Sequence, residues 1–522
     1  MSALASGPHP PEPATRIRAG ELALLVSVFV VAACGLVYEL AAGTLASYLL
    51  GDSILQFSTV IGSYLFAMGV GSYLSRHIER ELVAHFLRIE LLVAMVGGLM
   101  PAALFALHSV AASSFHVALY LMVGLVGTLV GLEIPLVMRL LKRYFHSRYA
   151  LKDLVSQVLT FDYLGALLVS VAFPLVLLPH LGLIRTGLFF GLLNALVAVW
   201  TLWLFRPELR RWWTHALACA ACIGVLLGAF AAAGHLTTWA EDRFYDDRVL
   251  YAESSLYQRV VVTEGPTGTR LFLNGNLQFH SRDEYRYHEA LVHPAMAAHG
   301  APKQVLVLGG GDGMAVREVL KHPAVEQVTL VELDPHMTEL FTRQPLLRQL
   351  NQDALHADKL RIVHADAFGW LEQHPDARFD VIVVDFPDPT NFAIGKLYTR
   401  TFYQLIDQHL NASGYAVVQT TSPLVARRSF WTVATTLEAA GLTVTPYHAH
   451  VPSFGEWGFL IASRRPYRRP SALPEGLRFL TLQGLPALFD FPPDMARVPT
   501  EVNRLSNQVL VQQYEAEWGQ AR

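Results

Sequence analysis

Before residue 236, the pattern of hydrophobic and polar positions is a series of long apolar runs. Four tryptophans, Trp200, Trp203, Trp212 and Trp213, gather at one proposed boundary between runs, as interfacial aromatic residues do. Each run is close to the roughly 20 mostly apolar residues that cross a bilayer core. The pattern therefore predicts an α-helical multi-pass membrane domain over residues 21–236, with about seven transmembrane helices. The predicted spans are residues 22–46, 54–75, 86–107, 115–138, 161–181, 184–205 and 215–235.

After residue 236 the apolar runs become short and alternate with amphipathic segments. The pair Asn274-Gly275 separates two apolar strands and is typical of a β-hairpin, so residues 237–300 are predicted to be β-rich. Residues 301–465 read as strands that alternate with helices, which predicts an α/β Rossmann-like domain of the class I methyltransferase type. Residues 466–522 begin with prolines and end in an amphipathic pattern, typical of a covering appendage or an interaction helix. Residues 1–20, rich in proline and alanine, are predicted to be disordered.

Composition supports a membrane protein and excludes other classes. Of the 522 residues, 52% are hydrophobic and 16% charged, and the mean hydropathy is +0.34. The net charge of −3 and the lack of a basic stripe argue against nucleic acid as a partner. The three cysteines, Cys34, Cys219 and Cys222, all lie in predicted spans, so the part after residue 236 can form no disulfide. The 21 histidines show no spacing typical of a metal site, and we expect no metal.

A glycine-rich turn follows the first strand of the α/β part. Gly309, Gly310 and Gly311 let the backbone approach a ligand closely, as in nucleotide pockets. Asp312 places a carboxylate inside this turn, where it would repel a diphosphate. The turn therefore predicts a ligand that carries positive charge.

Acidic residues also occur where four predicted strands reach their carboxyl ends, which form one rim in a parallel sheet. One reading is that each acid is an ordinary helix cap or turn former. Together they favour a pocket for a cation at that rim. The acids are Asp312, Glu332, Asp366, Asp385 and Asp388.

Residues from about 250 to 465 resemble the spermidine synthases, which are polyamine aminopropyltransferases. The resemblance rests on Tyr257-Gln258 in an early strand, the run from Asp283 to Glu289, the Gly-Gly-Gly-Asp312-Gly turn with Arg317-Glu318, and Asp385-x-x-Asp388-Pro389. It implies transfer of an aminopropyl group from decarboxylated S-adenosylmethionine to an amine, usually putrescine. The products would be spermidine and methylthioadenosine, and no cofactor besides this co-substrate is expected.

The resemblance also implies roles for individual residues. Asp385 would be the general base and Asp388 would hold the acceptor amine. The residues implied for the amine and the aminopropyl chain are Tyr287, His288, Asp312, Asp388 and Gln419. The residues implied for the adenosine part of the donor are Gln258, Glu332, Asp366, Ala367, Gly309 and Gly311, with Glu332 on the ribose and Asp366 near the adenine.

Three phenylalanines depart from the family pattern. Phe386 follows the predicted base where relatives usually carry a small polar residue, and Phe392 replaces a residue that often touches adenine. Phe454 keeps the ring of a tyrosine that contacts the acceptor in many relatives but lacks its hydroxyl. Putrescine is the default acceptor, and a different amine stays an alternative.

Other functions stay open at this point. The soluble half could bind polyamine without catalysis, as part of a membrane transporter or sensor. A methyltransferase would use a similar sheet, but Asp312 and the Tyr287-His288 pair count against it. Glu39, Glu133 and Asp162 lie inside predicted spans, where acids suggest either a cation route or a structural pairing with a hydroxyl or a basic group. Relatives commonly pair, so a homodimer is plausible.

The predicted location is the inner cell membrane, but the side of the catalytic half is open. Basic residues gather after the second, fourth and sixth predicted spans, for example Arg76, Arg139 and Arg206, which places the amino terminus in the cytoplasm. Seven spans would then put the catalytic half outside. The expected substrates are made in the cytosol, which favours the inside.

Overall fold

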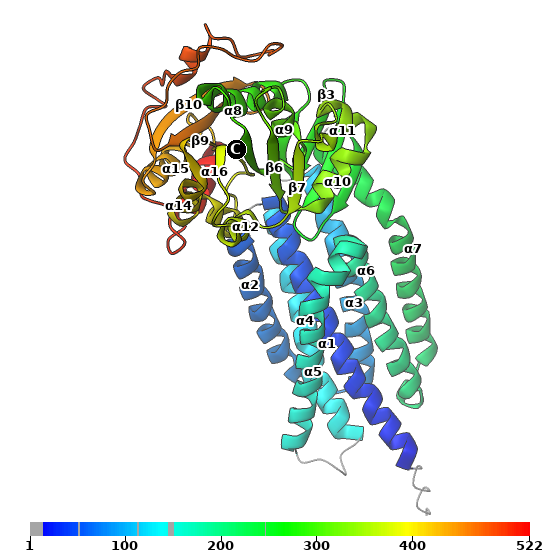
Figure 1. Cartoon of the computed structure of the whole chain (residues 1–522). Coiled ribbons are helices and arrows are strands. Elements are labelled where there is room, and N and C mark those ends of the chain that lie inside the picture. The colour runs from blue at the N-terminus through cyan, green and yellow to red at the C-terminus, as the bar shows by residue number, and fades with distance from the viewer. Residues whose placement is uncertain (1–13, 51–52, 112–113, 145–150, 246, 522) are drawn as a thin grey trace, which may run out of the picture. The chain divides into compact units, whose positions relative to one another are not determined.

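The computed structural model describes the chain except residues 1–13, 51–52, 112–113, 145–150, 246 and 522 (Figure 1). The chain divides into two compact units, Met1–Asp246 and Asp247–Arg522, which we describe one at a time. Residues 1–20 were predicted to be disordered. Residues 1–13 lie outside the described residues, and residues 14–20 are helical, because a helix begins at Ala14.

Helices make up nearly all of the described residues of the first unit. Its α-helices are α1 (Ala14–Leu50), α2 (Ser53–Leu74), α3 (Leu82–Val110), α4 (Phe115–Tyr144), α5 (Leu151–Ala172), α6 (Leu178–Leu204) and α7 (Trp212–Tyr245). Short helical turns are η1 (Ser75–His77), η3 (Phe173–Leu177) and η4 (Arg206–Glu208). Because α7 continues to Tyr245, the β-rich part begins later than the predicted residue 237.

Within the described residues, six helical segments are long and apolar enough to cross a membrane. One of them, Lys152–Leu204, is 53 residues long and contains the fifth and sixth predicted spans. At about 1.5 Å per residue this run is more than twice as long as a bilayer core of about 30 Å is thick. Gly182 breaks the run with a non-helical backbone (φ 71°, ψ 173°), so a span fits on each side of the break.

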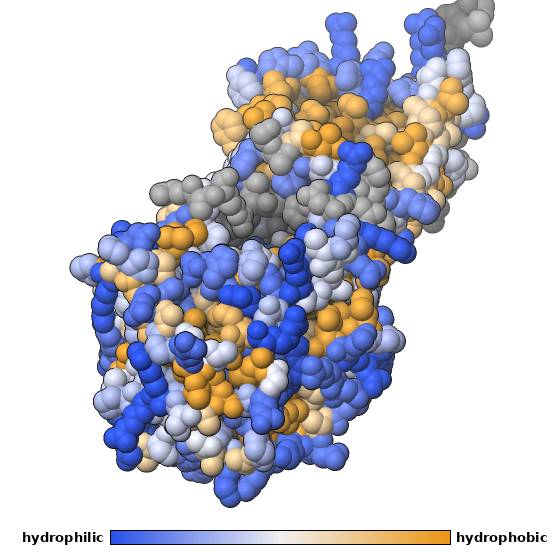
Figure 2. Space-filling model, turned by 90° about the horizontal axis from the view of Figure 1, so that it is seen from above, coloured by the Kyte–Doolittle hydropathy of each residue, from blue (hydrophilic) through white to orange (hydrophobic). Residues whose placement is uncertain are grey.

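Many large apolar side chains of this unit face outward. Figure 2 shows orange, hydrophobic atoms over wide parts of the helical unit. Phe66 and Trp203 are 76% and 79% exposed, which is costly in water and is expected of a surface that meets lipid.

Two acids lie in the core of this unit. Glu90 on α3 and Glu133 on α4 are fully buried, and among the described residues neither carboxylate has a hydrogen-bond partner. The pairing with a hydroxyl or basic group that was one expectation for Glu133 is therefore not seen there. Glu90 lies inside the predicted span 86–107 but was not singled out from the sequence. Glu39 and Asp162 are only half-buried.

The second unit opens with a small antiparallel sheet. Its strands β1 (Arg248–Ser254), β2 (Arg259–Gly265), β3 (Gly268–Leu273) and β4 (Asn276–His280) are paired in chain order. Asn274 and Gly275 connect β3 to β4 with φ of 50° and 80°, which confirms the predicted hairpin. Gln258 lies just before β2 rather than within an early strand.

A seven-stranded sheet forms the centre of this unit, in the order β10-β11-β9-β8-β5-β6-β7. Strands β5 to β9 run parallel to one another, and β11 is antiparallel to both β9 and β10. The strands are β5 (Gln304–Gly309), β6 (Gln327–Glu332), β7 (Leu360–His364), β8 (Phe379–Asp385), β9 (Leu410–Gln419), β10 (Thr443–Val451) and β11 (Gly455–Ser463). The predicted Rossmann-like architecture with a small additional sheet is confirmed.

Helices cover both faces of the large sheet, as Figure 1 shows. In β5, Val305 and Val307 face one apolar core, which includes α8, and Leu306 and Leu308 face the other, which includes α14 and α15. Continuous apolar runs in the sequence follow from this two-sided burial. The helices are α8 (Glu284–His299), α9 (Met314–Val319), α10 (Pro335–Arg343), α11 (Pro345–Leu350), α12 (Ala367–Gln373), α13 (Phe392–Gly395), α14 (Arg400–His409), α15 (Arg427–Ala439) and α16 (Val509–Ala521), with short turns η5 (Ala354–His356), η6 (Lys396–Tyr398) and η7 (Leu485–Phe489).

Candidate active site

The strand order reverses between β5 and β8, where such sheets bind their ligands. Gly309 at the end of β5 is paired with Asp385 at the end of β8. Gly309 has φ 79°, and a Cβ there would lie 2.3 Å from the Asp385 carbonyl oxygen. Only glycine therefore allows the turn to pass this close to Asp385.

Asp385 lies in a buried polar setting. Tyr287, on α8, donates its hydroxyl to Oδ1 of Asp385 at 2.7 Å. Burial raises the pKa of Asp385 to about 6; the nearby charge of Asp312 adds to this, whereas His288 and the Tyr287 hydrogen bond oppose it. A carboxyl that titrates close to neutral pH is suited to accept a proton from a substrate.

His288 and Asp312 complete this side of the site. Nδ1 of His288 hydrogen-bonds Oε2 of Glu284 at 2.8 Å. Burial alone would lower the pKa of His288, but the hydrogen bond and charge of Glu284, with Asp312 and Asp385, raise it overall. Burial raises the pKa of Asp312, whose Oδ1 accepts a hydrogen bond from the Met314 amide at the start of α9 (2.9 Å). Asp312 is thus both a helix-end residue and part of the site.

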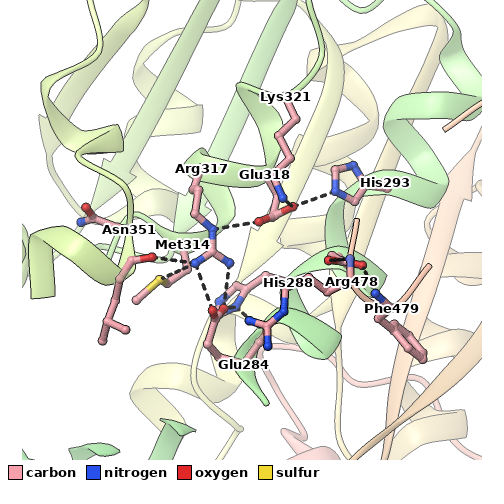
Figure 3. A network of polar contacts seen from close by, with 12 residues as sticks. Glu284, His288, His293, Met314, Arg317, Glu318, Lys321, Asn351, Arg478 and Phe479 are labelled. Atoms are coloured by element: carbon pink, nitrogen blue, oxygen red, sulfur yellow. Dashed lines mark hydrogen bonds and ion pairs between the residues drawn. The ribbon is translucent and has the colours of Figure 1, made fainter. Parts of the chain in front are cut away.

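A buried ionic network contacts His288 through Glu284 (Figure 3). Arg317 binds both carboxylate oxygens of Glu284, at 3.0 and 2.9 Å, and contacts Glu318 at 2.8 Å through Nε. Glu318 also contacts Nε2 of His293 at 2.8 Å and Nζ of Lys321 at 2.6 Å. The network joins α8 to α9 and fixes the face of α8 that carries His288.

Asp388 forms the second acidic position. Its Oδ2 accepts a hydrogen bond from Tyr514 at 2.7 Å, while its buried Oδ1 has no partner among the described residues. Burial raises the pKa of Asp388 to about 7, and the hydrogen bond from Tyr514 opposes this rise. Gln419 lies at the end of β9. Its side-chain nitrogen donates a hydrogen bond to the Tyr398 hydroxyl at 3.0 Å, and its side-chain oxygen accepts one from the Trp457 ring nitrogen at 3.2 Å. An ammonium group would give Oδ1 of Asp388 the partner it lacks.

Glu332 occupies the position expected for a ribose-binding acid. Its oxygens accept hydrogen bonds from the Gly311 and Asp334 amides, at 3.0 and 2.9 Å. Burial raises the pKa of Glu332 to about 7. The Gln258 side chain donates a hydrogen bond to Asp334 at 3.1 Å. Asp334, which was not singled out from the sequence, therefore connects Gln258 and Glu332, two residues expected to bind the adenosine.

Asp366 and Ala367 lie at the start of α12. Asp366 accepts a hydrogen bond from the Gly369 amide at 3.0 Å, so it is a helix cap, and its other oxygen pairs with Lys396 at 2.6 Å. Burial would raise the pKa of Asp366, but the Lys396 contact and the backbone hydrogen bonds lower it. Lys396 thereby ties the segment after Pro389 to the start of α12.

The structure gathers seven of the predicted site residues in two groups. Asp385, Tyr287, His288 and Asp312 interact directly or through their charges. Gln258, Glu332 and Gly311 meet around Asp334. The sequence missed Tyr514, which comes from the segment predicted to be a covering appendage and whose only signal was an amphipathic pattern.

Comparisons with known proteins identify the family of this chain. Residues 284–470 match the family model described as "Spermine/spermidine synthase domain". Polyamine aminopropyltransferase 1 of Ralstonia nicotianae is 52% identical over 520 residues, which covers 97% of each chain. Polyamine aminopropyltransferase of Leptospira interrogans is 48% identical over 498 residues, covering 95% of this chain and 99% of the relative. A crystal structure of spermidine synthase with the transition state analogue AdoDATO is 29% identical and covers 47% of this chain and 86% of its own, with a TM-score of 0.44. The chain belongs to the polyamine aminopropyltransferase family of enzymes.

Proposed function

We propose that this enzyme transfers the aminopropyl group of decarboxylated S-adenosylmethionine to putrescine, giving spermidine and methylthioadenosine. Asp385 acts as the general base. The observation that carries the proposal is the pair Asp385 and Asp388, two half-buried carboxyls with pKa values raised to about 6 and about 7. The unpartnered Oδ1 of Asp388 supports an ammonium ligand beside the base.

The chemistry is a displacement at carbon. An amine nitrogen forms a bond to the aminopropyl carbon next to the sulfonium, and the carbon–sulfur bond breaks with its electron pair on sulfur. The attacking nitrogen must first be neutral, because a protonated amine has no lone pair. Asp385 takes that proton, and the buried site holds both reactants in line.

Charge in the glycine-rich turn selects the donor. S-adenosylmethionine carries a carboxylate where the decarboxylated donor has none, and Asp312 would repel it inside a buried site. Tyr287 and His288 line the aminopropyl path with Asp312, and Asp388 and Gln419 hold the acceptor. Gln258, Glu332, Asp366 and Ala367 hold the adenosine, and Gly309 and Gly311 leave room for it.

The first unit anchors the enzyme as a multi-pass domain in the inner membrane. Helices of span length and exposed apolar side chains support this part of the proposal. A transporter or sensor with a non-catalytic second unit is the competing function, and it has no need of a base beside Asp388.

The test uses full-length protein in detergent. Methylthioadenosine release is measured with decarboxylated S-adenosylmethionine and putrescine, and with each substrate alone. We expect release only when both are present, and a loss of at least ~100-fold in Asp385→Asn, the scale of a missing general base. Asp376→Asn, the same change at an exposed residue, serves as the control and should match wild type. Equal rates in Asp385→Asn and wild type would remove Asp385 from the mechanism.

A further inference from the structure

The last helix, α16, lies against the acceptor side of the site. It packs on α13 and α15 and is drawn in red in Figure 1. Glu517 accepts hydrogen bonds from the Arg428 amide at 2.8 Å and from the Ser429 amide and hydroxyl at 3.0 and 2.7 Å. Gln513 accepts another from Thr432 at 2.6 Å. These contacts fix α16 to the amino-terminal half of α15.

One face of α16 contacts Asp388, the second acid of the site. Tyr514 donates its hydroxyl to Asp388, and the Trp518 ring nitrogen donates to Thr421 at 2.9 Å. A Cβ on Gly395, in α13, would lie 2.6 Å from Val511, so the helix is seated closely on the loop that follows Asp388. The positions of the Tyr514 and Trp518 rings are therefore fixed by their own hydrogen bonds and by the packing of α16 on α13 and α15.

These two rings complete a row of aromatic neighbours. Ring centroids are 6.3 Å apart for Tyr287 and Phe454, 5.1 Å for Phe454 and Trp457, 6.4 Å for Trp457 and Trp518, and 6.0 Å for Trp518 and Tyr514. The two tyrosines at the ends of the row bind Asp385 and Asp388, respectively. The row thus runs from the proposed base to the second acid. Aromatic faces stabilise ammonium groups and pack on methylene chains.

We propose that α16 forms the far wall of the acceptor site and limits the length of the amine that is accepted. A short diamine places its reacting nitrogen at Asp385 and its second ammonium at Oδ1 of Asp388. Tyr514 and Trp518 then block any extension beyond Asp388, so that longer polyamines are excluded. This inference rests on the proposed function and names its acceptor class.

The experiment compares putrescine with spermidine as acceptor for full-length wild type, Tyr514→Phe, Trp518→Ala and Trp518→Phe. Gln512→Ala, at an exposed position of the same helix, is the control. We expect Tyr514→Phe to raise KM for putrescine by about tenfold with KM for the donor unchanged, because one hydrogen bond to a charged group is lost. The rise should be larger near pH 6 than near pH 8, because without the hydroxyl the Asp388 carboxylate is protonated more readily.

Trp518→Ala should raise the ratio of kcat/KM for spermidine over putrescine by at least about tenfold, and Trp518→Phe should restore most of the wild-type preference. Thermal unfolding of each variant identifies a loss of fold. The inference is overturned if both tyrosine and tryptophan variants keep the amine KM and the acceptor ratio of Gln512→Ala. It is also overturned if KM for the donor and KM for putrescine rise together in Tyr514→Phe, since a loosened domain would do that.

Failure of the proposed function gives a different result. If wild type releases no methylthioadenosine with either amine, transfer to these amines is excluded, and putrescine binding is measured by calorimetry. Weaker binding in Tyr514→Phe than in wild type supports the acceptor wall without the reaction. Equal affinities overturn it.

Discussion

Two carboxyls of the site, Asp385 and Asp388, are half-buried, and each accepts a hydrogen bond from a tyrosine hydroxyl. Asp385 and Asp388 both have raised pKa values, to about 6 and about 7, so each is protonated at mildly acidic pH. A protonated Asp385 cannot accept a proton, and a protonated Asp388 loses its attraction for an ammonium group. We therefore expect kcat/KM to rise with pH, with the midpoint of this limb near about pH 7, and to level off above about pH 8.

A pH profile of kcat/KM between about pH 5 and about pH 9 measures this limb. In Asp388→Asn the remaining limb should belong to Asp385 alone and become shallower. A profile that stays flat down to about pH 5 in wild type would contradict the raised pKa values.

Arg317 neutralises two buried acids, Glu284 and Glu318, at the back of His288. Burial alone would raise the pKa of Glu284, but His288 and Arg317 outweigh it and lower the pKa to about 2. A lowered pKa means that the ionised pair stabilises the fold above the ordinary carboxyl range, and that this contribution is lost as pH falls toward 2. We expect Arg317→Met to lower the free energy of unfolding by roughly 3–5 kcal/mol at neutral pH, because it leaves buried charges unpaired.

Denaturant unfolding of the full-length protein in detergent measures this loss. Arg343→Met is the matched control, since Arg343 pairs with Glu339 in an exposed position on α10 and its loss should cost far less. Equal destabilisation by both changes would show that the buried network carries no special stability.

At the scale of elements, glycines allow α2 and α4 to approach each other closely. A Cβ at Gly71 would lie 2.0 Å from the Thr128 carbonyl oxygen, and one at Gly131 would lie 2.1 Å from that of Met68. Helices in a bilayer associate through such contacts between small residues. We expect Gly131→Ala to separate the pair and to lower both the thermal unfolding temperature in detergent and the yield of monodisperse protein.

Gly124→Ala is the control for this prediction, because a Cβ at Gly124 on the same helix meets no atom within 4 Å. It should be neutral or slightly stabilising, since alanine favours a helix more than glycine does. If Gly124→Ala and Gly131→Ala behave alike, the close approach of α2 and α4 is not important for the stability of this unit.

Most elements of the second unit could be predicted from the sequence because their signals are local. Apolar runs gave β5, β6 and β8, whose two faces are both buried, and Asn274-Gly275 gave the hairpin. Long-range contacts were not predictable in this way. Tyr514 and Asp388 are 126 positions apart, and no local pattern states which acid a helical tyrosine will meet.

Other differences have physical causes of the same kind. The sequence analysis placed Gln258 in a strand, whereas the residue lies just before β2, and its side-chain amide donates a hydrogen bond to Asp334. The fifth and sixth predicted spans form one helical run because only Gly182 interrupts it, and one non-helical residue leaves no polar gap in the sequence.

At the scale of the whole molecule, the residues of the candidate site all come from Asp247–Arg522, the second of two compact units. The sequence from Gln258 to Trp518 supplies the base, the acids and the aromatic row. The first unit has helices of span length and exposed apolar side chains, which suit an anchor. We therefore expect the chemistry of aminopropyl transfer to depend on the second unit and membrane attachment to depend on the first.

A chain that begins at Asp247 tests this division. We expect it to remain in solution after membranes are sedimented, and to keep kcat/KM for putrescine within about tenfold of the full-length enzyme, because its cores and its network lie within the unit. The full-length enzyme should stay in the membrane pellet after alkaline extraction. Asp385→Asn in the short chain is the control for residual activity and should lose at least ~100-fold, as in the full-length protein. A folded short chain, shown by cooperative thermal unfolding, that no longer transfers the aminopropyl group would mean that the helical unit acts on catalysis and is more than an anchor.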